Sequence, residues 1–326
     1  MKILVTGGAG FIASHVADRY LAEGHEVVIA DNLSTGFRRN VNPGARFYEL
    51  DIRDEATVEE LFRRECPEVI NHHAAQMDVR KSTRMPVEDA AINILGSLNL
   101  ILASQRHGLR QFIYISTGGA TYGEPQYVPV DEAHPINPIS QYGISKHSVE
   151  HYLYLYHANH GLNSVVLRYP NLYGPRQTPH GEAGVVAIFA GQMLAGQQPT
   201  IFGDGNKTRD YCYIDDVVTA NLLVLGRVGH EIFNIGTGIP TTDREVFEAV
   251  RDAVGVPMEP IFAPPRLGEI QHVYLTAAKA ERELGWRARV PFVEGVRRAV
   301  DYYRDLLVRD GELLGQVGRG DVVRIS

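Results

Sequence analysis

The chain has 326 residues, of which 44% are hydrophobic and 22% charged, as is usual for a soluble globular protein with one large or two smaller domains. Its formal net charge is -7 and its basic residues form no long run, which argues against a nucleic-acid partner. The first strand reaches a glycine turn too early for a signal peptide, and no apolar run approaches the ~20 residues that span a bilayer. We therefore expect a cytoplasmic protein that does not enter a membrane.

Short apolar runs rich in β-branched residues alternate with segments of helical periodicity. Strands are expected at Ile3 to Thr6, Glu26 to Asp31, Phe47 to Leu50, Val69 to His72, Gln111 to Ser116 and Asn163 to Arg168. Helices are expected from about Phe11, from about Glu55, over Val87 to His107 and over Ser140 to His160. This alternation predicts an α/β fold, a Rossmann-type doubly wound parallel sheet with helices on both faces.

The alternation ends at about residue 170, where proline and glycine become frequent. We expect residues 1–170 to form a Rossmann domain, and residues 171–326 to form a smaller C-terminal α/β lobe that binds the substrate. Apolar segments within residues 213–236 are predicted to return to the first sheet.

The spacing of cysteine and histidine residues indicates neither a disulfide nor a metal site. Cys66 and Cys212 lie far apart and form no C-x-x-C pair, which fits a reducing compartment, and we expect both to be small buried residues. His72 and His73 are adjacent but have no carboxylate or cysteine at the spacing of metal ligands. No metal is expected.

A glycine-rich turn, TGGAGFIA at 6–13, joins the first strand to the first helix, which is the context of a dinucleotide-binding fingerprint. Gly7 would permit the tight turn, and Gly10 would let the backbone approach a pyrophosphate at the helix N-terminus. Asp31 ends the second strand 21 residues after Gly10, where a carboxylate can hold both ribose hydroxyls and repel a 2′-phosphate. NAD is therefore favoured over NADP.

Two nearby pairs of residues can each be interpreted in two ways. Arg38 and Arg39 could accommodate a 2′-phosphate or could be surface charges. The pair Asp51-Ile52 follows the third strand and could cap an adenine pocket, although Asp51 could equally begin a loop.

The segments STGGATYG at 116–123 and YGISK at 142–146, taken with the glycine turn, resemble the extended short-chain dehydrogenase/reductase family. That resemblance implies a catalytic group of Thr117, Tyr142 and Lys146. Tyr142 and Lys146 are four residues apart and would share one helical face. A phenol with an ordinary pKa near ~10 is a poor base at neutral pH, so the ammonium and a positive nicotinamide ring would be needed to favour its anion.

Four further segments resemble the nucleotide-sugar branch of that family, and within it the bacterial 4-epimerases: HHAAQMDVRKS at 72–82, RYPNLYGPRQ at 168–177, GDGNKTRDY at 203–211 and PPRLGE at 264–269. The likeness extends to about Trp286. It implies NAD-dependent 4-epimerisation of a nucleotide sugar, with UDP-glucose and UDP-galactose as the expected pair, through a 4-keto intermediate and enzyme-bound NADH. A homodimer through the helices at Val87 to His107 and Ser140 to His160 is also implied.

The same resemblance assigns residues to the two ligands. Thr117 and Asn171 would contact the substrate, Arg209 and Arg266 would clamp its diphosphate as guanidinium forks, and a small Val273 would leave room for an N-acetyl group in the sugar pocket. The residues expected at the cofactor are Gly7, Gly10, Phe11, Ile12, Asp31, Asn32, Ser34, Thr35, Gly36, Asp51, Ile52, His73, Ala74, Ala75, Gln76, Asn93, Tyr142, Lys146 and Pro170.

One departure concerns the catalytic hydroxyl. In the usual epimerase pattern it lies four residues before the Tyr-Gly pair, which is Gly118 here, so Thr117 would supply it after a local backbone shift that Gly118 and Gly119 permit. These glycines replace the Thr-Asp-Glu of sugar dehydratases, which disfavours dehydration. Two alternatives remain: a uronate epimerase or decarboxylase on the same scaffold, and a nucleotide-sensing protein without catalysis.

Overall fold

The computed structural model describes residues 1–179, 184–266 and 270–310, and its main feature is a seven-stranded parallel sheet. All neighbouring strands of this sheet pair in parallel, and the order across it is β3 (Arg46–Glu49), β2 (Glu26–Asp31), β1 (Lys2–Thr6), β4 (Val69–His72), β5 (Gln111–Thr117), β6 (Ser164–Tyr169) and β11 (His230–Asn234). The predicted Rossmann-type sheet is therefore confirmed. β11 extends it by pairing with β6, although the division into domains stays a prediction.

Alternate residues of the central strands enter different apolar cores, so both faces of the sheet are covered. Ile3 and Ile113 pack in one core with helices α1 (Phe11–Ala22) and α8 (Ile214–Leu223). Leu4 and Phe112 pack in the other core with α2 (Glu55–Glu65), α5 (Gly96–Arg106) and α6 (Gln141–His160). This period of two is what a doubly wound sheet requires.

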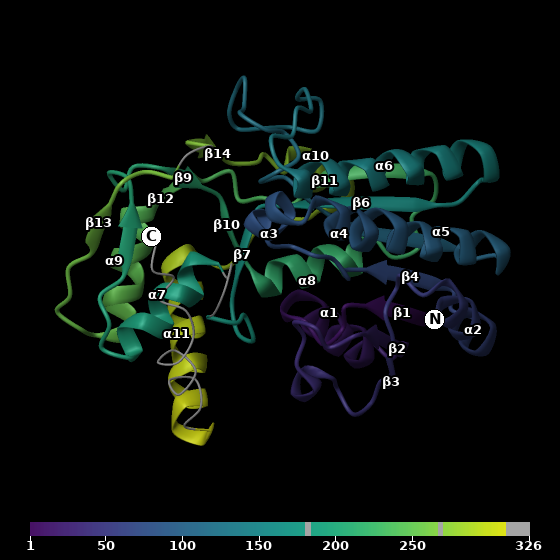
Figure 1. Cartoon of the computed structure of the whole chain (residues 1–326), viewed down its shortest axis with the longest axis horizontal. Helices are drawn as coiled ribbons and strands as arrows, with labels where there is room; N and C mark the ends of the chain where they lie inside the picture. Colours follow the sequence, from purple (N-terminus) through teal and green to yellow (C-terminus); the bar gives the residue numbers. More distant parts are fainter. Residues whose placement is uncertain (180–183, 267–269, 311–326) are drawn as a thin grey trace.

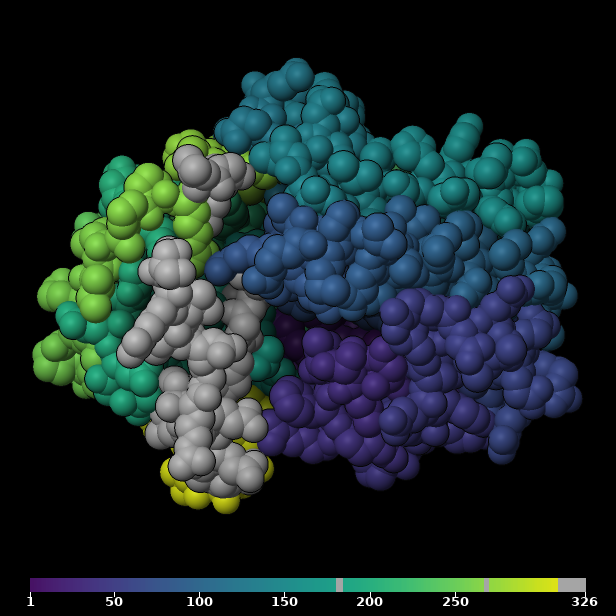
Figure 2. Space-filling model, in the orientation of Figure 1, coloured from purple at the N-terminus to yellow at the C-terminus, as the bar shows by residue number. Residues whose placement is uncertain are grey.

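The second part of the molecule lies beside the carboxyl ends of the sheet strands (Figure 1). It contains three small sheets, formed by β7 (Asn171–Tyr173) with β10 (Tyr211–Tyr213), β8 (Thr200–Phe202) with β13 (Ile261–Ala263), and β9 (Thr208–Arg209) with β12 (Thr241–Thr242) and β14 (His272–Val273). Its helices are α7 (Val185–Leu194), α9 (Asp243–Val254), α10 (Ala278–Leu284) and α11 (Phe292–Asp310). In the space-filling view the purple and blue residues lie on one side and the bright green residues on the other (Figure 2).

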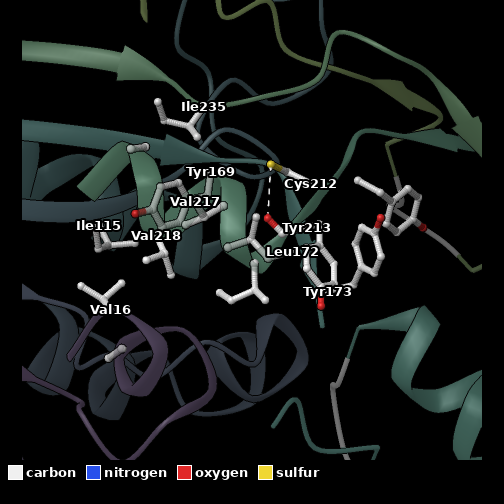
Figure 3. Packing of buried hydrophobic residues seen from close by; sticks show 14 of the residues in the cluster. Val16, Ile115, Tyr169, Leu172, Tyr173, Cys212, Tyr213, Val217, Val218 and Ile235 are labelled. Carbon is white, nitrogen blue, oxygen red and sulfur yellow. Dashed lines mark hydrogen bonds between the residues drawn. The ribbon is translucent and has the colours of Figure 1, made fainter. Parts of the chain in front are cut away.

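The apolar core that contains α1 continues into this second part. Figure 3 shows Val16 of α1 and Ile115 of β5 in the same cluster as Tyr173 of β7 and the buried Cys212 of β10. Because the packing is continuous, the carboxyl edge of the sheet is held against the smaller sheets.

Two expectations about single segments are wrong. Cys66 is exposed, because it ends α2 in the left-handed conformation with φ 44°. A long apolar helical run also exists: Pro86–Arg106 comprises α4 (Pro86–Ala90), the π-helical turn η2 (Ala91–Leu95) and α5, and its length and composition would allow it to cross a membrane. However, Leu100 and Ile101 of this run are buried in the second core, so it is a core helix of the fold.

Two short helices complete the described elements. The 3-10 turn η1 (Arg38–Asn40) follows β2, and α3 (Val79–Arg84) packs against α4 and α6.

Candidate active site

The glycine turn between β1 and α1 is closed by backbone contacts. Gly7 has φ +70°, and a Cβ there would lie 2.8 Å from the backbone nitrogen of Ala74. A Cβ at Gly8 would lie 2.5 Å from a methyl carbon of Ile29. Gly10 caps α1 without a side chain, so the first N–H groups of the helix, which include those of Phe11 and Ile12, point out of the turn. Such an N-terminus is suited to a pyrophosphate.

The carboxylate predicted for ribose binding lies directly beside this turn. Asp31 is 8% exposed, and its oxygens accept hydrogen bonds from the backbone N–H groups of Ala9 at 2.9 Å and Leu33 at 2.7 Å. The loop that follows folds back on the turn, because a Cβ at Gly36 would lie 2.9 Å from that of Ala9. Ser34 and Thr35 are exposed on this loop.

The residues expected at the adenine end have partners within the protein. Asn32 donates to Asp51 at 3.0 Å. Hydrogen bonds from Arg53, against the effect of burial, lower the pKa of Asp51 to about 2. Ile52 is buried and packs where a side chain at Gly96 would otherwise sit.

The two arginines near the ribose carboxylate lie over aromatic rings. The guanidinium of Arg38 lies 4.3 Å from the ring centroid of Phe47, and that of Arg39 lies 4.8 Å from the ring centroid of Phe37. Both stack on aromatic rings near the surface.

The loop after β4 is tied to α6 by a buried asparagine. Asn93, in the π-helical turn, donates to the carbonyl oxygen of Gln76 at 2.9 Å and to the hydroxyl of Ser145 at 3.1 Å, and it accepts from the Gln76 N–H at 2.8 Å. Because Asn93 is only 2% exposed, its hydrogen bonds hold the loop after β4 in position. π-helical turns are frequent at functional sites for such reasons.

Two histidines of this region differ. His72 bonds Thr6 at 2.7 Å and Ser97 at 2.9 Å. His73 keeps both ring nitrogens buried and without a hydrogen-bonding partner among the described residues. Burial, with the charge of Lys146, lowers the pKa of His73 to about 3, so this imidazole is neutral at any working pH. Ala74 contacts the glycine turn, and Ala75 follows Ala74 in the chain. The loop 73–76 therefore lies along the glycine turn, which we call the cradle.

Tyr142 and Lys146 lie on the first two turns of α6, which begins with Ser140 as its N-cap. The helix comes very close to the loop after β5, because a Cβ at Gly143 would lie 2.5 Å from the carbonyl oxygen of Ala120. The ammonium of Lys146 lies 4.2 Å from the ring centroid of Tyr114. Glycine at 143 is therefore what allows the Tyr-x-x-x-Lys pair to face this loop.

The protein alone disfavours charge on both members of the pair. Burial raises the pKa of Tyr142, and the Asp89 carboxylate raises it further. Burial lowers the pKa of Lys146 to about 7, although Glu150 and Asp89 act in the opposite direction. A phenolate at Tyr142 therefore needs additional positive charge nearby.

Thr117 is the last residue of β5, and its hydroxyl lies toward the smaller sheets. A Cβ built at Gly119 would be 3.8 Å from both Thr117 Oγ1 and Asn171 Oδ1, so the three residues surround one space. The neighbouring Ser116 hydroxyl instead donates to Glu150 at 2.5 Å. Gly118 does not have a positive φ, and a Cβ there would meet the end of the Leu275 side chain, which would have to shift.

A narrow cavity brings most of the predicted substrate residues together. Its lining consists of Gly119, Pro170, Asn171, Arg209, Asp210, Val273 and Leu275. These come from the loop after β5, the segment after β6, β9 and β14, so the cavity lies at the carboxyl edge of the main sheet. Ligands of open α/β sheets bind at this edge.

The two predicted phosphate-binding arginines differ in position. Arg209 lines the cavity, and its guanidinium donates to the carbonyl oxygens of Thr208 at 2.8 Å and Ile270 at 2.6 Å. Arg266 is exposed and lies 3.7 Å from the ring centroid of Phe202, and within the described chain it does not contribute to the cavity lining.

Three buried charged residues of this region were not found by sequence reasoning. Glu150, Arg168 and Asp89 are each 1% to 3% exposed. Glu150 and Asp89 act on the charge of Lys146, and Arg168 pairs with Glu150. The one available signal was the spacing of Glu150, which continues the four-residue step from Tyr142 to Lys146. Within residues 1–179, 184–266 and 270–310, no group of three or more His, Cys, Asp or Glu could hold a metal ion.

The chain is similar to known proteins over most of its length. Residues 3–236 match the NAD dependent epimerase/dehydratase family. A putative UDP-glucose 4-epimerase from Methanocaldococcus jannaschii is 46% identical over 303 residues, covering 93% of this chain and 98% of the relative.

Two solved structures share the whole fold. UDP-glucose 4-epimerase from Thermotoga maritima with UDP-glucose has a TM-score of 0.93 at 48% identity and covers 94% of this chain and 100% of its own. The Thermus thermophilus UDP-glucose 4-epimerase complex with NAD has a TM-score of 0.89 at 46% identity and covers 93% and 99%. The extent of these matches, together with a glycine turn and a Tyr-x-x-x-Lys helix at one sheet edge, leads to one conclusion: this chain belongs to the NAD-dependent epimerase/dehydratase family.

Proposed function

We propose that the protein interconverts UDP-glucose and UDP-galactose by NAD-dependent 4-epimerisation. The observation that carries the proposal is that Tyr142, Lys146 and Thr117 all lie at the carboxyl edge of the sheet. One side of that edge has a closed glycine turn and the other has a narrow cavity. The relatives named UDP-glucose 4-epimerase support the choice of substrate.

The described residues fit NAD. The uncapped N-terminus of α1 at Gly10 would hold the pyrophosphate, Asp31 a ribose, and the loop 73–76 with its unpartnered His73 ring the nicotinamide half. When bound, NAD supplies a positive ring and an acceptor for the hydrogen removed from C4′ of the sugar.

The protein side chains then handle the proton. Tyr142 would accept the proton of the 4′-hydroxyl and return it to the same oxygen in the second half of the cycle, when C4′ regains its hydride on the opposite face of the ring. Lys146 would favour the phenolate while it remains an ammonium, and Thr117 would donate a hydrogen bond to the same oxygen as charge develops on it. Because the proton and the hydride both return to the sugar, no net oxidation occurs.

The intermediate 4-keto sugar must turn over in its pocket while the nucleotide stays bound. Asn171 and Arg209 lie together at the cavity and would hold the diphosphate as the pivot. Arg266 would join them only by leaving its stacked position on Phe202.

A second substrate pair is favoured by one observation. Val273 is a small side chain in the cavity lining, so an N-acetyl group at C2′ would meet less obstruction than beside a large aromatic side chain. We therefore include UDP-N-acetylglucosamine and UDP-N-acetylgalactosamine as additional substrates.

The functional unit proposed is a homodimer formed through the paired helices α5 and α6. The outer surface near these helices exposes large apolar side chains: Leu95 at 57%, Ile144 at 51% and Leu155 at 46%. Such side chains on neighbouring helices are suited to a symmetric contact. Sedimentation of the protein and of a Leu155→Glu variant tests it, since a monomer in both samples would contradict the proposal.

Purified protein should be incubated separately with UDP-galactose and with UDP-glucuronate, without added reductant. Formation of UDP-glucose from the first is the expected result. Carbon dioxide or UDP-galacturonate from the second would indicate a decarboxylase or uronate epimerase instead. If neither incubation gives a product while the protein still binds nucleotide, the protein is a nucleotide sensor.

A further inference from the structure

The reactive face of α6 continues one turn beyond Lys146 to a buried carboxylate. Tyr142, Lys146 and Glu150 follow one another at steps of four residues and therefore project from one side of the helix. The side chain of Glu150 is 2% exposed, and it lies against β5 and β6 beneath the site.

Each carboxylate oxygen of Glu150 has two polar contacts. Oε1 accepts from the Ser116 hydroxyl at 2.5 Å and from Arg168 Nε at 3.1 Å. Oε2 accepts from Arg168 Nη2 at 2.5 Å and lies 3.0 Å from His147 Nδ1. Arg168 continues the network by donating to the Tyr122 hydroxyl at 2.8 Å.

We propose that Glu150 is a positioning residue for the epimerisation, whose buried negative charge keeps Lys146 protonated and whose hydrogen bond to Ser116 orients the end of β5. The inference deepens the proposed function and rests on it. Glu150 and Ser116 themselves have no part in the mechanism proposed above.

The charge part of the argument depends on what surrounds Lys146. The groups that face it from the neighbouring elements are Tyr114 of β5, Asp89 of α4, His72 and His73 at the end of β4, and Tyr142 and Glu150 of α6 itself. Burial lowers the pKa of both histidines, so they carry no charge at neutral pH. The negative charges that support the ammonium are therefore Glu150 and Asp89, and burial still lowers its pKa to about 7.

The orientation part concerns the two hydroxyls at the end of β5. Successive residues of a strand point to opposite faces. Because Glu150 binds the Ser116 hydroxyl below the sheet edge, the next residue, Thr117, is directed to the space shared with Gly119 and Asn171. The same carboxylate thus acts on two members of the proposed catalytic group.

The test compares variants with different charges. Glu150→Gln removes the negative charge but keeps the shape, and Glu150→Gln/Arg168→Met also removes the partner cation, in case the single variant leaves Arg168 unpaired and fails to fold. Ser116→Ala and Tyr122→Phe are the controls for the titration, because they remove hydrogen bonds and no charge. Ser116→Ala should in addition lower kcat equally at every pH, because it removes the contact that orients the end of β5.

Two measurements are required. The first is the ratio of kcat between variant and wild type across pH. Loss of the carboxylate should lower the Lys146 pKa by about one unit, so that kcat falls by about tenfold at pH 8 and only by about twofold at pH 6. The second is the titration of the ε-carbon resonances in ¹³C-lysine-labelled protein, which has only five lysines, with Lys146→Arg to assign the signal.

Glu150→Gln and the double variant should show a lowered Lys146 pKa in the titration. Ser116→Ala and Tyr122→Phe should show the wild-type Lys146 pKa. If Lys146 titrates as in wild type in both charge variants and Ser116→Ala epimerises at the wild-type rate, the proposal is wrong and Glu150 is a purely structural residue. The resonance titration needs no turnover, so a protein that fails to epimerise any sugar would contradict the proposed function without deciding the role of Glu150.

Discussion

The cofactor side and the substrate side of the site differ in how closely the backbone is packed. On the cofactor side a Cβ at Gly7 would lie 2.8 Å from the backbone of Ala74. On the substrate side a Cβ at Gly119 would lie 3.8 Å from its nearest neighbours, which is ordinary contact. Gly7 therefore has no room for a side chain, whereas Gly119 does. A family that keeps one cofactor and varies its sugars needs this combination.

The two sides also hold buried carboxylates differently. Burial would raise the pKa of Glu150, but hydrogen bonds from His147 and Arg168 and the charge of Arg168 lower it to about 2. Asp210, at the cavity, is held by the N–H groups of Thr237 and Leu275 and the Thr237 hydroxyl, and burial raises its pKa. At Glu150 the cation Arg168 outweighs the effect of burial on the pKa. At Asp210 neutral hydrogen-bond donors offset that effect only in part.

The largest expected effect is at Tyr142, where the two sides meet. Tyr142→Phe removes the proposed proton acceptor, so kcat should fall by about 10²- to 10⁴-fold while bound NAD is retained. Tyr154→Phe, on an exposed face of α6, is the control and should turn over normally. Steady-state assays and the nucleotide content of the purified proteins provide the measurements, and substantial residual turnover in Tyr142→Phe would contradict the assigned role.

The contrast between the carboxylates predicts opposite acid dependences. Glu150 has a folded pKa below its unfolded value of ~4.3, so its stabilisation exists above that pH and up to about 3 kcal/mol is lost as pH falls toward 2. Asp210 has a raised folded pKa, so its contribution is greatest at low pH and is lost as pH rises through that value.

Urea unfolding of wild type, Glu150→Gln and Asp210→Asn between pH 2 and 6 measures both slopes. Relative to its own variant, wild type should lose stability with acid in the first comparison and gain it in the second. Slopes of the same sign would show that the two sites do not differ in this way.

The packing contrast is sharpened by two matched substitutions. Gly7→Ala places a Cβ against Ala74 at a positive φ and should cost at least about 1–2 kcal/mol of unfolding free energy, with loss of bound NAD. Gly119→Ala should keep stability and NAD and alter KM for the sugar. Thermal unfolding and nucleotide content compare them, and equal losses would remove the distinction between the two sides.

The smallest expected effect is on sugar selectivity. Val273→Phe enlarges a side chain in the cavity lining, so kcat/KM for UDP-N-acetylgalactosamine should fall by about tenfold more than for UDP-galactose. The ratio of the two substrates is its own control for general damage. An unchanged ratio would place the C2′ substituent away from Val273.

More of the cofactor side than of the substrate side follows from local sequence patterns. Strand alternation, the turn at 6–13 and Asp31 are local patterns, and the structure places them together at one sheet edge. The stacking of Arg266 on Phe202 depends on segments about 60 residues apart, which no local pattern connects. The exposed Cys66 was missed for a local reason, the left-handed end of α2.

The doubly wound sheet and the common helical face of Tyr142 and Lys146 follow from the sequence, because strand and helix periodicities place neighbouring residues without reference to the rest of the chain. The electrostatic state of these two residues depends instead on the three-dimensional packing. Lys146 is buried between carboxylates from α4 and α6 and beside an aromatic ring of β5, and a charge inside a protein responds to everything packed around it, however distant in sequence.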